Sequence, residues 1–404
     1  MNINGVKQRW RIAAIALIAG SVLLSSGCGG GDKKSSSWQA GATGGASSNP
    51  APAPTQSTVA VTSPKAEATD VIAATDVKYT SDDPSNTTVT VTGPDGKEVD
   101  GTLDKDTKTW TPAKALAWKT KYTVTVKGTA TEGKSGTTTS SFTTMSKPTK
   151  QIRVTSFLGD GQTVGVGMPL IVKFSRSIPE SYRDDVERRM TVTATPAQVG
   201  TWHWISPTEV HYRPKVYWKA NSKVFYKIQL AGVPLGSGYY GRSDVTVDLK
   251  IGRSMIMTVQ DKTKRMTVTQ NGKVIKTIPV SLGKPSTPSA SGTMVVMEKK
   301  EHTVFDTTDT DGAAGYRTPI DYAQRITWSG QFVHAASWSE GQQGRVNVSH
   351  GCVNVSEAMG KWLFDRTLMG DPVIVAGTPE KLKNGDGWTD WNMSWDQYKK
   401  GSYL

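Results

Sequence analysis

Cysteine is nearly absent from this chain of 404 residues, in which only Cys28 and Cys352 occur. Because Cys28 lies in an N-terminal segment, the folded part has a single thiol and no intrachain disulfide. The sequence also lacks the HExxH motif of zinc peptidases. Oxidising compartments usually pair or eliminate thiols, so a lone Cys352 in an exported chain indicates a chemical role. A buried, inert cysteine is the alternative.

A long apolar run is also missing. The most hydrophobic stretch, residues 12–24, follows three basic residues and is too short for a comfortable transmembrane helix. It leads into Ser25-Ser26-Gly27-Cys28, which resembles a bacterial lipoprotein cleavage site, although such sites usually have Leu where Ser25 stands. We expect a signal peptide over residues 1–28, lipid on Cys28, and an exported chain anchored at the outer face of the cell membrane. The alternative is an ordinary secretory signal with an incidental cysteine.

Acidic residues are outnumbered, and the formal net charge is +13. This balance favours an anionic environment such as lipid headgroups or a carboxylate-bearing wall polymer. Nucleic acid is the other usual partner of a basic chain, but an export signal argues against it. Dispersed, solvated surface charge is an equally good explanation of the excess.

The composition favours β-structure over helical bundles. Glycine is abundant, and Thr and Val recur in short alternating runs. Residues 29–65 consist mostly of Gly, Ser, Ala, Pro and Thr, which is typical of a flexible linker that buries no core. The chain is too long for one ordinary domain, and a typical domain length of about 150 residues predicts two or three domains.

Two segments after the linker share a short sequence motif. Trp110-Thr111-Pro112 leads to Trp118-Lys119 and an alternating strand, while Tyr212-Arg213-Pro214 leads to Trp218-Lys219 and another such strand. The two copies of the motif lie about 100 residues apart, which indicates a duplicated β-sandwich. We expect immunoglobulin-like domains at 66–147 and 148–250. Neither has the cysteine pair of antibody domains, so the label describes architecture only.

A third unit is expected over residues 251–378, with a tail over 379–404. Asn271-Gly272 predicts a tight primed hairpin turn. Residues 357–369 predict the best helix of the unit, with Ser356 as its N-cap. Trp388, Trp391 and Trp395 indicate an aromatic strip that packs the tail onto the catalytic unit. Direct substrate contact is the less favoured interpretation.

Two histidines stand near the lone thiol in sequence. His350 precedes Cys352 by two residues, and His334 follows a short predicted strand eighteen residues upstream. A thiol attacks a carbonyl as a thiolate, so it needs a base or cation close by. Gly351 allows a tight turn, at which consecutive backbone N–H groups can form an oxyanion hole.

The arrangement of His334, fourteen residues, then Ser-His-Gly-Cys-Val-Asn at 349–354 resembles the signature of the L,D-transpeptidase catalytic domain, also called the YkuD fold. The phrases at 283–288 and 315–319 resemble the family as well. The whole layout is similar to that of actinobacterial members. It implies a mainly β chain: two immunoglobulin-like sandwiches, then a YkuD-type catalytic domain with a short helix and a Trp-rich C-terminal tail.

The resemblance implies a role for each residue of the motif. Cys352 would be the nucleophile and His334 the general base, oriented by the backbone carbonyl of Ala335. His350 and Gly351, together with Cys352, would form the oxyanion hole.

The resemblance also implies substrate-side residues. Tyr316 would lie on a flap over the donor pocket, Trp338 and Ser349 would line that pocket, and Asn354 would hold the loop. Arg345 is suggested by charge alone as a partner of a stem carboxylate.

The implied reaction is acyl transfer on peptidoglycan, without a cofactor or metal. The nucleophile attacks a tetrapeptide donor stem, releases D-Ala, and passes the acyl group to a diamino-acid amine of an acceptor stem. Carbapenem β-lactams would acylate the same thiol. Three alternatives remain: a carboxypeptidase or hydrolase with the same residues, a silent wall-binding lipoprotein, and a metal site of His334, His350 and Cys352. His203 and His211 are expected at the surface or core edge, and His302 receives no role.

Overall fold

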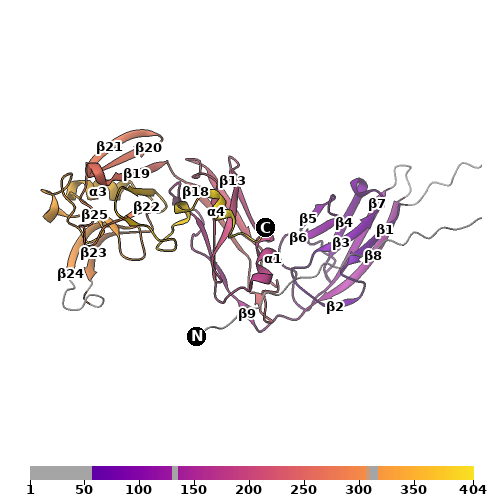
Figure 1. Cartoon of the computed structure of the whole chain (residues 1–404). Coiled ribbons are helices and arrows are strands. Elements are labelled where there is room, and N and C mark those ends of the chain that lie inside the picture. Colours follow the sequence, from indigo (N-terminus) through magenta and orange to yellow (C-terminus); the bar gives the residue numbers. More distant parts are fainter. Residues whose placement is uncertain (1–56, 130–134, 307, 309–316) are drawn as a thin grey trace, which may run out of the picture. The chain divides into compact units, whose positions relative to one another are not determined.

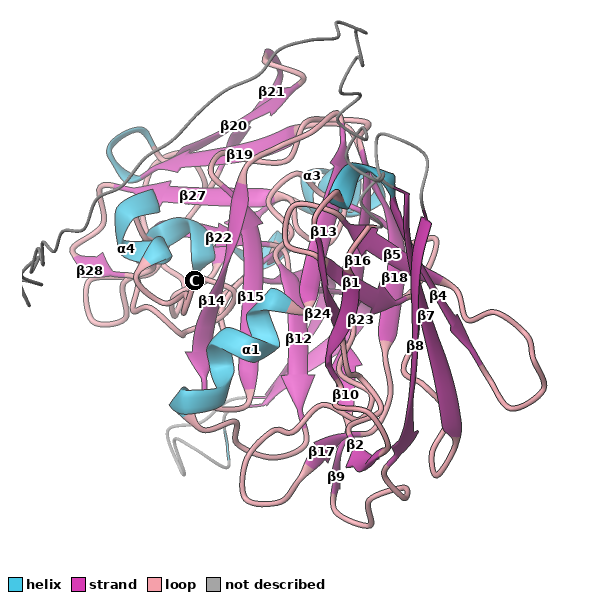
Figure 2. Ribbon diagram, turned by 90° about the vertical axis from the view of Figure 1, so that its right-hand side faces the viewer, coloured by secondary structure: helices cyan, strands magenta, loops and turns pink. Residues whose placement is uncertain are grey.

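The computed structural model describes residues 57–129, 135–306, 308 and 317–404. The expected signal peptide with Cys28 and most of the expected linker, as well as Tyr316, lie outside the described residues. Strands dominate what is described, and the helices α1 (Arg183–Arg188), α3 (Glu357–Arg366) and α4 (Trp395–Lys399) are short (Figure 1, Figure 2). The predicted mainly β class is therefore confirmed. No helix in the described part is long and apolar enough to cross a membrane.

The first sandwich packs two four-stranded sheets, in the orders β1-β3-β6-β5 and β2-β8-β7-β4. It begins earlier than expected, because β1 lies within residues we assigned to the linker and pairs with β3. Alternating Val and Tyr side chains from both sheets fill its core. The strands are β1 (Val59–Ser63), β2 (Ala68–Val71), β3 (Val77–Ser81), β4 (Thr87–Thr92), β5 (Gly101–Asp104), β6 (Thr109–Pro112), β7 (Lys121–Thr129) and β8 (Ser135–Thr144).

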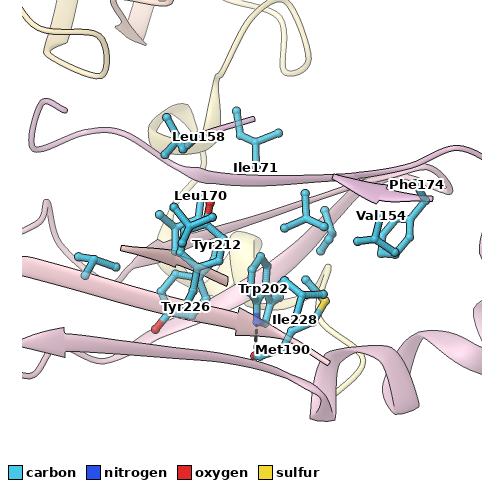
Figure 3. Packing of buried hydrophobic residues seen from close by; sticks show 14 of the residues in the cluster. Val154, Leu158, Leu170, Ile171, Phe174, Met190, Trp202, Tyr212, Tyr226 and Ile228 are labelled. Carbon is cyan, nitrogen blue, oxygen red and sulfur yellow. Dashed lines mark hydrogen bonds between the residues drawn. The ribbon is translucent and has the colours of Figure 1, made fainter. Parts of the chain in front are cut away.

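The second sandwich repeats this plan with sheets β10-β12-β15-β14 and β11-β18-β16-β13, while β9 and β17 form a small pair. Figure 3 shows its core, where the Trp202 indole N–H donates to the Met190 carbonyl at 2.9 Å. The strands are β9 (Gln151–Ile152), β10 (Val154–Ser156), β11 (Thr163–Val164), β12 (Leu170–Phe174), β13 (Met190–Thr195), β14 (Gly200–Ser206), β15 (Glu209–Pro214), β16 (Lys223–Ile228), β17 (Tyr240–Gly241) and β18 (Val245–Ile251).

The repeated sequence motif lies in equivalent strands of the two sandwiches. Its Pro ends β6 in the first and β15 in the second, and the strand that follows is β7 or β16. The duplication read from the sequence therefore corresponds to equivalent strands at these positions.

The third unit contains a six-stranded sheet, β21-β20-β19-β27-β22-β28, and a four-stranded sheet, β23-β24-β25-β26. A core of Met, Val, Ile and Leu side chains includes residues of both sheets and Leu363 of α3. The strands are β19 (Met255–Gln260), β20 (Arg265–Gln270), β21 (Lys273–Pro279), β22 (Ala290–Val295), β23 (Glu298–Asp306), β24 (Arg317–Arg325), β25 (Phe332–Ala335), β26 (Val353–Val355), β27 (Pro372–Ala376) and β28 (Glu380–Lys381).

Two local predictions in this unit agree with the structure. Asn271 and Gly272 both have positive φ, 48° and 80°, as a primed turn between β20 and β21 requires. The Ser356 hydroxyl accepts the Met359 N–H at 3.3 Å and caps α3. The helix ends at Arg366, three residues earlier than expected.

The tail packs against the catalytic unit, as expected, because β28 pairs with β22 and Leu382 lies in that unit's core. It also packs against the second sandwich, which we did not expect. The guanidinium of Arg213 lies 4.5 Å, 5.4 Å and 4.3 Å from the ring centroids of Trp391, Trp395 and Tyr398. Arg213 is buried, so these aromatic faces stabilise its charge. The Trp388 N–H also donates to the sulfur of Met297, so the tail contacts the catalytic unit as well.

Candidate active site

The first predicted pair, His334 and Cys352, is brought together by two adjacent strands. β25 and β26 pair in parallel, with Val333 opposite Val353 and His334 opposite Asn354. Cys352 is the residue just before β26. Both strands are buried, so their short apolar sequences fix the register by packing on α3 and the sheet core.

A cavity of about 610 Å³ opens beside these strands. It brings together five predicted residues: His334, His350, Cys352, Trp338 and Ser349, with Asn354 as a sixth. None of the described lining residues is Asp or Glu. The lining consists of Phe305, Thr318, Ile320, His334, Trp338, Ser339, Gln342, Val348, Ser349, His350, Cys352 and Asn354.

The imidazole of His334 is held in one tautomer. Its Nδ1 lies 2.7 Å from the backbone oxygen of Ala335, and a carbonyl can only accept, so Nδ1 carries the hydrogen. Burial lowers the pKa of His334 to about 4. The ring is therefore neutral at pH 7, and Nε2 is an acceptor. This is the arrangement that a general base needs.

Cys352 is a buried, protonated thiol. Burial raises its pKa to about 12, and the positive charge of Arg325 opposes this only in part. The sulfur lies 3.7 Å from the Gly330 carbonyl oxygen, which accepts from the thiol. At pH 7 the thiol and the imidazole are therefore both neutral.

The turn before the thiol is fixed by two serines. The Ser349 hydroxyl donates to the Cys352 carbonyl at 2.7 Å and accepts the Gly351 N–H at 3.1 Å. The Ser289 hydroxyl donates to the Gly351 carbonyl at 2.7 Å. Gly351 has φ +123°, a conformation that side-chain-bearing residues rarely adopt. Glycine is therefore required by the backbone here.

Asn354 is hydrogen-bonded through its backbone and its side chain. Its backbone exchanges both hydrogen bonds with Ser281, and its side-chain amide donates to the Ser339 hydroxyl at 3.1 Å. The side-chain oxygen of Asn354 is buried and has no partner among the described residues. Because Asn354 lines the cavity, this oxygen is a candidate acceptor for a substrate N–H.

The remaining predicted residues lie in different surroundings. Trp338 is 58% exposed, and its ring centroid lies 6.0 Å from that of His334, so it borders the cavity. Arg345 is exposed and is not one of the described lining residues. Tyr316 lies outside the described residues, so its placement on a flap stays a prediction.

Sequence reasoning missed three residues that contact the predicted site residues. The Phe305 ring packs edge-on against His334 at 5.3 Å, and Gly330 supplies the carbonyl that contacts the thiol. Lys284 places its ammonium 2.9 Å from Nε2 of His350. Of the three, only Lys284 could have been found from the sequence, because it belongs to the motif at 283–288 that resembles the family.

The other histidines have partners of their own. His211 is buried, with Nδ1 at 3.0 Å from Asp390 and Nε2 at 2.8 Å from Glu209. His302 is exposed and pairs with Asp321 at 2.6 Å. The described residues include no group of three or more His, Cys, Asp or Glu side chains arranged to hold a metal ion.

The fold and the site define a class: bacterial immunoglobulin-type domains joined to a β-rich enzyme domain with a His–Cys cavity. The chain matches the bacterial Ig domain family over residues 68–234 and the L,D-transpeptidase catalytic domain family, YkuD, over residues 254–375. The second match contains the whole His–Cys site.

Curated relatives agree with this assignment. L,D-transpeptidase 2 of Mycobacterium tuberculosis strain CDC 1551 is 35% identical over 332 residues, which cover 81% of this chain and 80% of the relative. L,D-transpeptidase 5 of strain H37Rv is 34% identical, covering 78% of this chain and 70% of the relative. A solved LD transpeptidase in complex with imipenem shares 30% identity, with a TM-score of 0.48, covering 57% of this chain and 100% of that one. The chain belongs to the L,D-transpeptidase family and is a transpeptidase enzyme.

Proposed function

We propose that this enzyme is a peptidoglycan L,D-transpeptidase that uses Cys352 as nucleophile and forms links between the third residues of two stem peptides. One observation carries the proposal. His334 and Cys352 line the same cavity, and the Nδ1 hydrogen of His334 is engaged by the Ala335 carbonyl, which leaves Nε2 as the basic nitrogen.

In the acylation step, the sulfur of Cys352 bonds to the carbonyl carbon of the third residue of a tetrapeptide donor. The thiol proton moves to Nε2 of His334, and from there to the nitrogen of the terminal D-Ala as its bond to the carbonyl carbon breaks. D-Ala leaves, and a thioester remains. Backbone N–H groups of the turn around Cys352 would stabilise the developing oxyanion, while the Ser349 hydroxyl engages the Gly351 N–H in the resting structure.

In the second step, the side-chain amine of a diamino acid on an acceptor stem attacks the thioester. A carbon–nitrogen bond forms while the carbon–sulfur bond breaks. Nε2 of His334 takes the proton from the amine and returns it to the sulfur of Cys352. The products are a cross-linked dimer and the free enzyme, and the reaction consumes no cofactor.

Carbapenems would react with the same thiol, because their strained ring carbonyl imitates the donor carbonyl. The relative solved in complex with imipenem supports this expectation. The ring opens as sulfur bonds to its carbonyl carbon, and the adduct stays on the enzyme when no amine can displace it.

The N-terminal segment suggests where the enzyme works. A lipid on Cys28 would tether the chain to the outer face of the cell membrane, and the Gly/Ser/Pro-rich segment after it would act as a spacer. The two sandwiches would then hold the catalytic domain toward the wall. The basic net charge suits a carboxylate-bearing polymer.

Mass spectrometry of the products from a purified disaccharide-tetrapeptide tests the proposal. We expect a dimer that has lost one D-Ala, with fragment ions that place the new bond between two third residues. Tripeptide without dimer would instead identify a carboxypeptidase, since water would have replaced the acceptor amine. Unchanged substrate with a folded enzyme would favour a silent wall-binding lipoprotein.

A further inference from the structure

The loop at Gly283–Ser289 is fixed against the turn that contains the nucleophile. Gly283 forms a parallel bridge with Ser349, and the Lys284 N–H donates to the Ser349 carbonyl at 2.9 Å. The Thr287 hydroxyl donates to the same carbonyl at 3.3 Å. A side chain at Gly283 would meet the Thr287 carbonyl at 2.1 Å, so the loop is closely packed. The position of Lys284 relative to Cys352 is therefore defined by the backbone.

The Lys284 side chain reaches the rim of the cavity. Its Nζ lies 2.9 Å from Nε2 of His350, and His350 lines the cavity beside Cys352. An ammonium has three donors and no acceptor, so Nε2 of His350 accepts one N–H. Two further N–H groups remain on the ammonium for other acceptors.

No anion of the protein balances this charge within the described part. The described residues place no Asp or Glu within ion-pair distance of Lys284, whereas Lys97, Lys121 and Lys361 each have such a partner. The described cavity lining has no carboxylate either. An exposed ammonium beside a cavity whose described lining has no acid favours an anionic group of the bound substrate.

We propose that Lys284 is a specificity-determining residue that binds a carboxylate of the donor stem. The inference rests on the proposed function, since it needs a stem peptide in the cavity. Two carboxylates are candidates: that of the terminal D-Ala, which lies a few bonds from the carbonyl attacked by Cys352, and that of the diamino acid. The charge-assisted hydrogen bond forms while the substrate binds, so its loss raises KM more than it lowers kcat.

The experiment compares full-length wild type with Lys284→Met on three tetrapeptide donors. One has both carboxylates, one ends in D-alaninamide, and one has an amidated diamino acid. For the first donor we expect K284M to raise KM by roughly 10-fold or more. The effect should disappear on whichever amidated donor lacks the bound carboxylate. K284R keeps the charge and should restore most of the affinity.

Controls separate this role from a structural one. Lys273→Met removes an exposed charge from β21 and should leave KM unchanged on every donor. A K284M variant that loses the same factor on all three donors, or none on any, would overturn the inference while leaving the proposed function intact. A wild type that makes neither dimer nor tripeptide from any donor would overturn both.

Discussion

The His334–Cys352 pair rests in its neutral form. Burial raises the pKa of the thiol to about 12 and lowers that of the imidazole to about 4, so neither group is charged between these values. A preformed thiolate–imidazolium pair is disfavoured in the empty cavity. In the proposed mechanism, attack on a carbonyl would therefore move the proton as the sulfur–carbon bond forms, and the backbone turn would stabilise the anionic intermediate.

The acylation rate should be nearly independent of pH between about 5.5 and 8. Protonation of His334 removes the base, but its lowered pKa places that loss near pH 4, below the ordinary histidine value. An ordinary thiol ionises at about pH 8.5, and its acylation rate rises there. Because the pKa of Cys352 is raised, we expect no such increase in rate in this range. Stopped-flow acylation by a carbapenem across this range checks the prediction. An inflection near 6.5, or a tenfold rise toward pH 8.5, would contradict the neutral pair.

Gly351→Ala should disable the site through the backbone. At φ +123° an added Cβ costs about 1–2 kcal/mol, although its nearest neighbour, Gln331, is 3.6 Å away. We expect a much reduced kcat because the oxyanion turn shifts. Gly96→Ala is the matched control, since Gly96 has φ +74° and open surroundings in the first sandwich. If G351A and G96A had similar melting temperatures and the same kcat, the conformation of the turn at Gly351 would not be needed for catalysis.

The sequence was sufficient to propose His334 and Cys352 as the reacting pair, but not to predict the residues around them. The spacing from His334 to Cys352 and the resemblance it carried predict both residues, because chemistry constrains their identities. Phe305 and Gly330 could not be found, since any apolar ring or any carbonyl meets the need and no pattern marks them. Arg345 was suggested by charge alone and is not one of the described lining residues; Lys284, which is not one of them either, contacts the lining residue His350.

At the scale of elements, the tail is held by a buried charge network. Asp390 accepts from His211 at 3.0 Å and from the Tyr398 hydroxyl at 2.9 Å. The charge of Asp390 raises the pKa of His211 to about 9 despite the opposing cost of burial. The imidazolium thus stabilises the contact between β15 and the segment before α4.

Stability should fall in alkaline solution for this reason. The folded pKa of His211 lies above its unfolded value, so its contribution is fully present below about 6.5 and is lost as pH rises through 9. The amount is about 3 kcal/mol at most. Thermal unfolding at pH 6.5 and 9.5 should show this decline in wild type and not in His211→Gln. His302→Gln, an exposed control, should decline as wild type does; an equal decline in H211Q would contradict the network's role.

Strands were easier to predict than their partners. Alternating residues around Val89, Val124 and Tyr226 marked β4, β7 and β16, because one face of each is buried. The boundary at residue 65 missed β1, whose five residues lie next to a polar, Pro-rich stretch. The contact of the tail with the second sandwich could not be predicted, since the Arg213 and His211 contacts join residues nearly 180 apart.

At the scale of the whole molecule, the order of parts suits an anchored enzyme. Two sandwiches precede the catalytic unit, and the chain matches a mycobacterial transpeptidase over 81% of its length. A spacer role for the two sandwiches stays a proposal. Anchoring depends on the N-terminal segment and is a prediction from its sequence.

Cys28→Ala should release the enzyme from membranes. Loss of the lipidated cysteine removes the only acyl chain that we propose, because Cys352 is buried in the catalytic domain. Fractionation of cells that express either form, followed by detection of the protein, checks this. Cys352→Ala should remain in the membrane fraction as the matched control. Retention of C28A at the wild-type level would identify another anchor.

Intact-protein mass spectrometry with a carbapenem tests the central claim most directly, namely that Cys352 is the acylated nucleophile. The account predicts that wild type gains the mass of one carbapenem, that peptide mapping places it on Cys352, and that folded Cys352→Ala gains nothing. An adduct on the C352A variant, or a folded wild type that stays unmodified, would contradict it.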